Sequence, residues 1–233
     1  MIPPSLHPVR ALLLDVGGTI LLADLDLVGS VLAEERIVVA RETLQTALLE
    51  ANRHYARAVS GGAEHGAGLD LLLSTWLEHA GLSDADSARG LELLLAAHDR
   101  YCLWRTVADG AAEGIAELRS AGVPVGVVSN SEGKLQQILD RAGLGGAFDT
   151  VLDSALEGLQ KPDPEIFLRA CARLDVAPGD ALYAGDMPEV DVRGAIDAGL
   201  QGALIDPYGA HPSYTEASRF SSVAALVAAI IAG

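Results

Sequence analysis

A small set of polar residues in this chain combines types that could transfer a phosphoryl group. Three are carboxylates, one is an ammonium group and two are small hydrogen-bond donors: Asp15, Asp186, Asp191, Lys161, Ser129 and Asn130. Three carboxylates in one place repel each other unless cations compensate their charge. Lys161 would supply one positive charge, and Mg²⁺, which prefers oxygen ligands, two more. We therefore expect a pocket in which a carboxylate nucleophile faces a bound phosphoryl group.

The elements that must position this set can be predicted from the apolar runs before it. Asp15 directly follows an unbroken apolar run at residues 11–14, and turn residues come next. Such a run is typical of a strand buried in a parallel sheet. Similar strands are expected at residues 123–128 and 181–184, each just before polar residues of the set. Since ligands bind beyond the carboxyl ends of such strands, we expect one shared site with Asp15 as the reacting group.

From about residue 107 onward, the pattern alternates between helices and strands. Helices are expected at residues 111–121, 134–142, 164–174, 190–198 and 222–231, and further strands at 148–152 and 203–205. This alternation favours right-handed crossovers and a parallel sheet. The predicted fold class is α/β, with a Rossmann-like parallel sheet flanked by helices.

Residues 22–106 have a different pattern, with apolar residues at three- and four-residue steps and no expected strand. Ser83 and Asp86 resemble a capping box for a helix that continues to about Trp104. The first strand is thus separated from its sheet by a helical insertion. We predict a core at residues 1–21 and 107–233 and an all-α domain at 22–106.

The amino-acid composition limits the classes of molecule that this chain is expected to bind. Sixteen Lys and Arg residues against 32 Asp and Glu give a formal charge of −16, which opposes binding to nucleic acids and anionic membranes. Cys102 and Cys171 have no metal-site spacing, so each is expected to be a buried free thiol. The N-terminus lacks a signal-peptide pattern, and the apolar stretch near 223–232 is too short to cross a bilayer. A cytoplasmic protein is expected.

In order and spacing, the polar set resembles the four motifs of the haloacid dehalogenase-like hydrolase superfamily. The matching segments are Asp15-x-x-Gly18-Thr19, Ser129-Asn130, Lys161-Pro162 and Gly185-Asp186-x-x-x-x-Asp191. The helical insertion resembles the α-helical cap of one branch. The resemblance implies a Mg²⁺-dependent phosphatase in which Asp15 becomes an aspartyl-phosphate. It also implies Asp15, the Gly17 carbonyl and Asp186 as metal ligands, and Asp191 orienting water at the ion. Ser129 and Asn130 would hold the phosphate, and Lys161 would neutralise charge.

Gly17 departs from the family pattern. Most phosphatases of the superfamily have an Asp there, which protonates the leaving oxygen and then activates water. General acid–base catalysis contributes about 10²–10⁴-fold, so fast turnover of a poor leaving group is in doubt. The metal ligand should survive, because that position contributes a backbone carbonyl.

The sequence leaves three hypotheses about the function open. The first is a phosphatase acting on a small phosphorylated metabolite. It could favour good leaving groups or use His54, His65 or His98 as the acid in place of the missing Asp. A second possibility is a phosphate- or partner-binding protein with little turnover, and a third is a metal-independent 2-haloacid dehalogenase. Phosphonate-cleaving relatives use a cap lysine, and residues 22–106 contain none. The chain could be a monomer or a homodimer.

Overall fold

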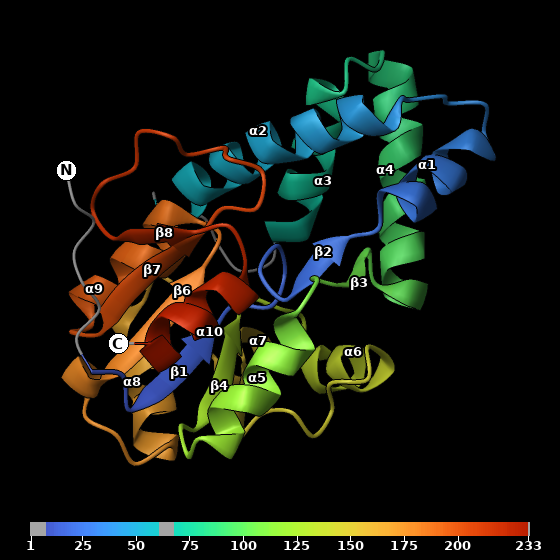
Figure 1. The fold of residues 1–233 in the computed structure, drawn as a ribbon. Coiled ribbons are helices and arrows are strands. Elements are labelled where there is room, and N and C mark those ends of the chain that lie inside the picture. Colours follow the sequence, from blue (N-terminus) through green and yellow to red (C-terminus); the bar gives the residue numbers. More distant parts are fainter. Residues whose placement is uncertain (1–7, 61–67, 233) are drawn as a thin grey trace. The chain divides into compact units, whose positions relative to one another are not determined.

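The computed structural model describes residues 8–60 and 68–232. Figure 1 shows the fold coloured along the chain. The chain forms two compact units, one of Met1–Leu22 with Thr106–Gly233 and one of Ala23–Arg105. The larger unit contains the six-stranded sheet.

The larger unit is built on a six-stranded sheet in the order β5-β4-β1-β6-β7-β8, with every neighbouring pair parallel. Its strands are β1 (Ala11–Leu14), β4 (Val125–Ser129), β5 (Thr150–Asp153), β6 (Ala181–Gly185), β7 (Gln201–Ile205) and β8 (Ser218–Phe220). All four residues of β1 are completely buried, which explains its unbroken apolar run. The predicted parallel sheet flanked by helices is confirmed.

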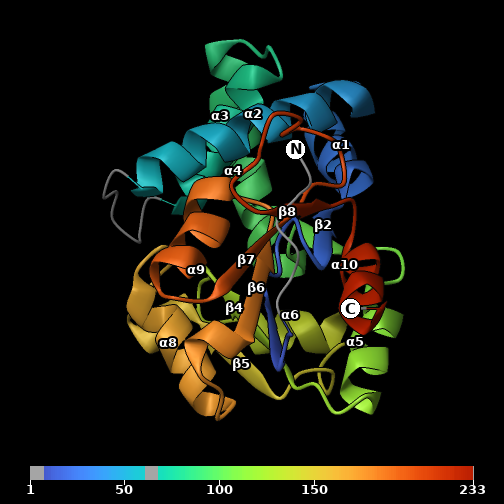
Figure 2. The same cartoon turned by 60° about the vertical axis from the view of Figure 1, so that its left-hand side comes forward.

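Helices cover both faces of this sheet. They are α5 (Ala111–Ser120), α6 (Leu135–Arg141), α7 (Ser154–Glu157), α8 (Pro164–Arg173), α9 (Gly194–Asp197) and α10 (Val223–Ala232). In Figure 2, α8 and α9 lie on one side of the strands and α5 and α10 on the other. On the α8 side, Leu13, Phe167 and Tyr183 belong to one buried apolar cluster. This cluster fixes β1 and β6 against α8 and thereby positions the strand ends.

The segment after β6 differs from the single helix expected at residues 190–198. Pro188–Arg193 forms a π-helical turn, and an α-helical turn, α9, follows it. Both Asp191 N and Val192 N donate to the Met187 carbonyl, at 2.9 and 3.4 Å. The wider turn arises where Asp191 Oδ2 accepts the Met187 amide at 2.9 Å. Such turns inside helices frequently occur at functional sites.

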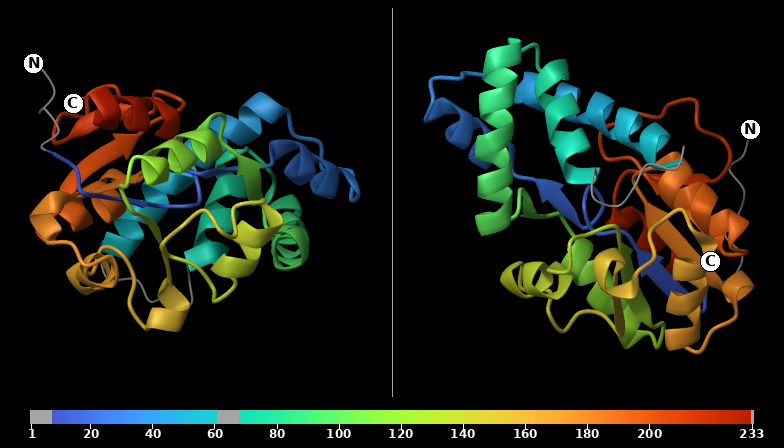
Figure 3. Two further views of the ribbon diagram at one scale, coloured as in Figure 1. Left: turned by 60° about the horizontal axis from the view of Figure 1, so that its bottom comes forward. Right: turned by 180° about the vertical axis from the view of Figure 1, so that it is seen from behind.

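The smaller unit is a helical bundle of α1 (Leu25–Ala33), α2 (Arg41–Ser60), α3 (Gly68–His79) and α4 (Asp84–Tyr101). The right-hand view of Figure 3 shows α3 packed beside α2 and α4. Trp76 is fully buried among these helices, and its indole N–H donates to the Leu44 carbonyl at 2.7 Å. The predicted capping of α4 is confirmed, because Ser83 Oγ accepts the Asp86 amide at 3.2 Å.

The prediction that residues 22–106 contain no strand is wrong. Two short strands, β2 (Leu21–Ala23) and β3 (Trp104–Val107), form a two-stranded sheet where the chain passes between the units. The expected helix to Trp104 instead ends at Tyr101, because Cys102 has a φ of 59°. Strands this short carry little periodicity, and their pairing joins residues about 80 positions apart, so no local pattern indicates them.

Two expectations from the composition can be compared with the described residues. Cys102 and Cys171 are both buried free thiols, as predicted. None of the helices in residues 8–60 and 68–232 is both long and apolar enough to pass through a membrane.

Candidate functional site

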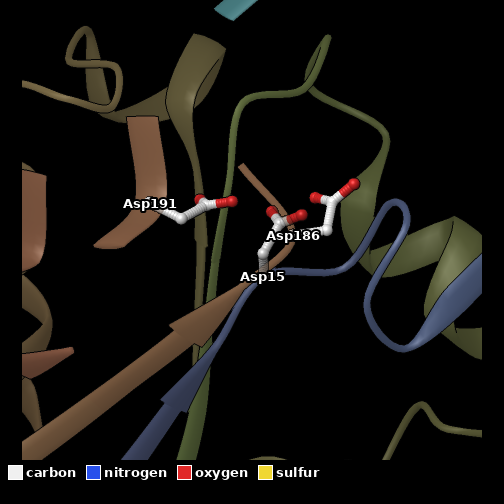
Figure 4. A group of neighbouring side chains, drawn as sticks. All are labelled: Asp15, Asp186 and Asp191. Atoms are coloured by element: carbon white, nitrogen blue, oxygen red, sulfur yellow. The ribbon is translucent and has the colours of Figure 1, made fainter. Parts of the chain in front are cut away.

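Three aspartates meet at the carboxyl end of the sheet. β1 lies between β4 and β6, and Asp15 and Asp186 directly follow β1 and β6. Asp15, Asp186 and Asp191 each offer a carboxylate oxygen, and these oxygens lie within 4.8 Å of one another. Figure 4 shows the three side chains converging from the ends of β1 and β6 and from the following turn. The parallel pairing thus brings together carboxylates that are about 170 residues apart in the chain.

Lys161 connects two of these carboxylates. Its Nζ donates to Asp15 Oδ1 and to Asp191 Oδ1, each at 2.6 Å. The Lys161 side chain is only 3% exposed, and those of Asp15 and Asp191 are 9% and 2% exposed. Charges removed from water to this extent need paired partners, and the ammonium group provides one for both carboxylates.

Asn130 is engaged with Lys161 rather than pointing at the carboxylates. Its Nδ2 donates to the Lys161 carbonyl at 3.0 Å, and its Oδ1 accepts the Lys161 amide at 2.8 Å. This two-bond clamp fixes the backbone that carries the ammonium group. Ser129, the last residue of β4, is buried at 6% exposure. That Ser129 and Asn130 hold a phosphate stays a prediction.

The loop after Asn130 is held by two residues that the sequence interpretation did not select. Asp153 accepts the amides of Gly133 and Leu135, each at 3.0 Å. Ser154 Oγ accepts the Ser131 amide at 3.0 Å and donates to the Ser131 carbonyl at 3.1 Å. Polar residues at the end of an expected buried strand were the available signal, and it resembles the one that identified Asp15.

The turn after Asp15 brings backbone close to Asp186. Gly18 has a φ of +82°, and a Cβ on it would lie only 2.3 Å from Asp186 Oδ2. Gly17 forms a bridge with Leu21, and its φ is not in the left-handed region occupied by Gly18. Gly18 therefore has both a conformational and a steric reason to be glycine, whereas the φ of Gly17 does not require one.

Tyr183 is a further member of the site that the sequence interpretation missed. Its hydroxyl accepts a hydrogen bond from Lys161 Nζ at 2.7 Å and donates to the Val128 carbonyl at 2.9 Å. The side chain is completely buried. A signal was present in the sequence, because a tyrosine inside a fully buried strand needs a hydrogen-bond partner for its hydroxyl.

The protonation equilibria reflect this crowding of charge. Burial raises the pKa of Asp15 to about 6, even though Lys161 lowers it. Burial, followed by the charges of Asp191 and Asp15, raises the pKa of Asp186 well above its ordinary value. Burial would lower the pKa of Lys161, but Asp15 and Asp191 raise it above its ordinary value. One ammonium group therefore does not fully compensate three carboxylates, and a further cation would be stabilised there.

The donor set fits a hard divalent cation. The three carboxylates are the oxygen ligands that Mg²⁺ prefers, and their oxygens converge within 4.8 Å. Asp191 is the least available of the three, because Oδ1 accepts Lys161 and Oδ2 accepts the Met187 amide. Asp15 and Asp186 are thus better placed to bind an ion directly, with Asp191 fixing their surroundings.

The sequence profile of the haloacid dehalogenase-like hydrolase family matches residues 9–199. The chain belongs to this family. Among curated relatives, human haloacid dehalogenase-like hydrolase domain-containing protein 3 is 35% identical over 138 residues, which are 59% of this hydrolase and 54% of that protein. The phosphoserine phosphatase of Thermus thermophilus is 40% identical over 105 residues, 45% of this chain and 42% of that enzyme. The matched segments span about half the length of these relatives.

Solved structures share the fold of this hydrolase. The HAD-hydrolase YfnB of Bacillus subtilis, in a crystal form bound to magnesium, has a TM-score of 0.72 with 22% identity, over 97% of this chain and 100% of that one. The L-2-haloacid dehalogenase RSc1362 has a TM-score of 0.68 with 20% identity, over 97% and 100% of the two chains. At these identities the likeness establishes the fold.

Of the three histidines considered as substitute acids, two lie in the described part of the chain, in different environments. His65 lies outside the described residues. His54 is exposed on α2. The Nδ1 of His98 accepts the Leu103 amide at 3.4 Å, and its ring stacks edge-on against Trp104 at 5.9 Å. The role of a histidine as acid stays a prediction.

Proposed function

We propose that this hydrolase is a Mg²⁺-dependent phosphatase that transfers the phosphoryl group of a small phosphorylated metabolite to Asp15. One observation carries the proposal: Lys161 is bonded to Asp15 at 2.6 Å, and Asp186 and Asp191 converge beside it. This arrangement suits a carboxylate nucleophile that must approach an anionic phosphate. Curated relatives that are phosphatases, including the phosphoserine phosphatase above, support it.

In the first step, a carboxylate oxygen of Asp15 attacks phosphorus, and the bond from phosphorus to the leaving oxygen breaks. Lys161, held against Asp15 and Asp191, offsets the negative charge that accumulates between the carboxylate and the phosphate. Ser129 and backbone amides of the following loop would bind phosphate oxygens, because the Asn130 side chain is engaged with Lys161. A Mg²⁺ ion held by Asp15, Asp186 and the Gly17 carbonyl would supply further charge neutralisation.

In the second step, water attacks phosphorus and releases phosphate, which restores the Asp15 carboxylate. At position 17 there is no side chain to protonate the leaving oxygen or to take a proton from this water. We therefore expect substrates with acidic leaving groups to react fastest. The residues 23–105 unit would act as a cap that selects the substrate.

The test is hydrolysis of aryl phosphates by the wild type and by Asp15→Asn. Activity should require Mg²⁺, stop in the presence of EDTA and be absent in Asp15→Asn. The matched control Asp197→Asn removes an exposed carboxylate from α9 and should keep full activity. Halide release from a 2-haloacid without metal would instead identify a dehalogenase, and the proposal would be wrong.

The missing carboxylate favours one second candidate, a phosphate-binding protein with little turnover. Gly17→Asp separates the two, because it restores a carboxylate at a position whose φ does not require glycine. If only the acid–base group is absent, turnover of aryl phosphates with poor leaving groups should rise by about 10²-fold or more. An inactive parent and an equally inactive Gly17→Asp, both binding phosphate, would support the binding protein.

A further inference from the structure

The Tyr183 hydroxyl lies inside the candidate site but has no role in the chemistry proposed above. It is one of three acceptors around Lys161 Nζ, at 2.7 Å, beside Asp15 Oδ1 and Asp191 Oδ1. It also lies 3.3 Å from Asp191 Oδ1. Among the groups that contact Lys161 Nζ, this hydroxyl is neutral whereas the two carboxylates can carry charge, so its presence needs its own explanation.

We infer that Tyr183 is a positioning residue, whose hydroxyl holds the Lys161 ammonium group in place between Asp15 and Asp191. The inference rests on the proposed function, because it concerns the cation that faces the Asp15 nucleophile. Tyr183 itself is not proposed to touch the substrate.

The hydrogen-bond directions support this role. A lysine ammonium group has three donors and no acceptor, so three acceptors satisfy it completely. Two of the three are supplied by carboxylates, and Tyr183 supplies the third. The Val128 carbonyl at 2.9 Å is the nearer of two acceptors for the tyrosine proton, the other being Asp191 Oδ1 at 3.3 Å, and a bond to either leaves the oxygen lone pairs to accept from Lys161. Without the hydroxyl, one N–H of a buried ammonium group would lose its acceptor, at a cost that favours rearrangement.

The ring is fixed by rigid elements. Tyr183 lies in β6, opposite Leu13 of β1, and its hydroxyl bonds Val128 of β4. Phe167 of α8 packs edge-on against the ring at a centroid distance of 4.9 Å. Three adjacent strands and a helix thus set the position of one oxygen atom. Groups on strands and helices hold a geometry more accurately than groups on loops.

The alternative explanation is structural, in which the hydroxyl only satisfies the buried Val128 carbonyl. Tyr183→Phe tests it, because phenylalanine keeps the ring and its packing while removing the oxygen. Tyr214→Phe is the matched control. The Tyr214 hydroxyl is also buried, but within the described residues it has no hydrogen-bond partner. A general effect of losing a buried hydroxyl should appear in both variants.

Steady-state kinetics on an aryl phosphate provide the first measurement. For Tyr183→Phe we expect kcat to fall about tenfold and KM to change less than about twofold. The reason is that the variant displaces the Lys161 ammonium group beside Asp15 and leaves the groups that contact the substrate in place. Tyr214→Phe should retain both constants. Unchanged kcat in a folded Tyr183→Phe would overturn the inference.

The second measurement does not depend on activity. The chain has only two lysines, Lys134 and Lys161, so ¹⁵N-labelled lysine gives two ammonium signals, which Lys134→Arg assigns. We expect the Lys161 signal to move in Tyr183→Phe while the Lys134 signal and both signals of Tyr214→Phe stay in place. An unmoved Lys161 signal would overturn the inference. If the wild type proves inactive on every phosphate ester, the proposed function fails, yet the ammonium signals still decide the role of Tyr183.

If Tyr183→Phe does not fold, a measurement on the wild type alone tests the inference. The buried hydroxyl proton should then show a nuclear Overhauser contact to the Lys161 ammonium protons, which lie next to it. Absence of that contact in a spectrum that shows both proton signals would overturn the inference.

Discussion

At the scale of single residues, the two glycines after Asp15 differ in physical purpose. Gly17 stands where the proposed mechanism would use an acid–base side chain, whereas Gly18 lets the backbone pass close to Asp186. The near contact at Gly18 and its φ of +82° are separate reasons for glycine. They can be separated experimentally, because Gly122 has the same φ of +82° and no atom within 4 Å of its Cβ position.

Gly18→Ala should therefore lose activity, and Gly122→Ala should not. Both pay a backbone cost of about 1–2 kcal/mol for a left-handed alanine. Only Gly18→Ala also pushes the Asp186 carboxylate out of its position. We expect the Mg²⁺ concentration for half-maximal activity to rise at least about tenfold, which corresponds to about 1.4 kcal/mol of lost metal binding. Equal Mg²⁺ dependence in the two variants would show that the contact with Asp186 is unimportant.

At the scale of elements, the end of β5 supports the loop after β4. The carboxylate of Asp153 accepts the amides of Gly133, Leu135 and Ala155, the last at 3.1 Å. Because Asp153 and Ser154 are both 3% exposed, water cannot easily replace these bonds. The geometry of the proposed phosphate-binding loop is thus set by a neighbouring strand.

Asp153→Ala should raise KM for phosphate substrates and lower stability. Three amides lose their acceptor, of which that of Leu135 is buried and the other two partly buried, and we expect about 1–3 kcal/mol of lost unfolding free energy for the three bonds together. Ser83→Ala removes the N-cap of α4 and should cost about 1 kcal/mol without changing KM. Urea unfolding and steady-state kinetics check both variants. A stability loss in Asp153→Ala with an unchanged KM would mean that this loop does not bind substrate.

The start of β4 is tied to α5 by an ion pair that should affect acid stability. Arg119 donates to both oxygens of Asp149, at 2.8 and 3.2 Å, and Asp149 also accepts the Val125 amide at 2.8 Å. The hydrogen bond from Arg119 lowers the pKa of Asp149 below its ordinary value. A lowered folded-state pKa adds stability above the unfolded pKa, and this stability is lost as pH falls through the folded pKa.

Asp149→Asn should thus be less stable than the wild type at pH 7, and the difference should shrink below about pH 4. Urea titrations at several pH values measure it. Asp197→Asn breaks an exposed pair with Arg193 and should leave the unfolding free energy almost unchanged, because solvent screens such pairs. A pH-independent difference for Asp149→Asn would contradict the assignment.

At the scale of the whole molecule, the formal charge of −16 and the convergence of three aspartates both oppose the folded state. Excess charge of one sign destabilises a compact state through self-repulsion. At the site, Asp15 and Asp186 have raised pKa values because burial and neighbouring carboxylates disfavour their charged forms. A bound cation would relieve part of this cost, which links stability to function.

Mg²⁺ should accordingly raise the melting temperature more than NaCl of equal ionic strength. A site filled at 100 times its Kd stabilises the folded state by about 2.7 kcal/mol. Asp186→Asn should melt at a higher temperature than the wild type in EDTA, because it removes a carboxylate whose charged form is disfavoured beside Asp191 and Asp15, but it should lose the specific response to Mg²⁺. Scanning calorimetry measures both effects. A full Mg²⁺ response in Asp186→Asn would exclude Asp186 as a ligand.

Much of the fold could be predicted because its signals are local. The buried run of β1, the glycines that follow α3, α5, α6 and α9 and the proline at the start of α8 each specify an element within a few residues. The N-cap Asp163, for example, accepts the Glu165 amide at 2.9 Å. The short strands β2, β3 and β8 were missed, since pairing with residues far apart in the chain stabilises them.

The sequence alone determined which residue types are available: one lysine, two aspartates at predicted strand ends, a third at a predicted helix start and no acid at position 17. Only the tertiary structure decided how they are connected. In the structure, the Asn130 side-chain amide donates to the Lys161 carbonyl, and Asp153 accepts the Gly133 amide of the loop after Asn130. The Tyr183 hydroxyl accepts a hydrogen bond from Lys161 Nζ. The physical reason is that strand order and side-chain direction fix such bonds, and both arise from packing between segments far apart in the chain.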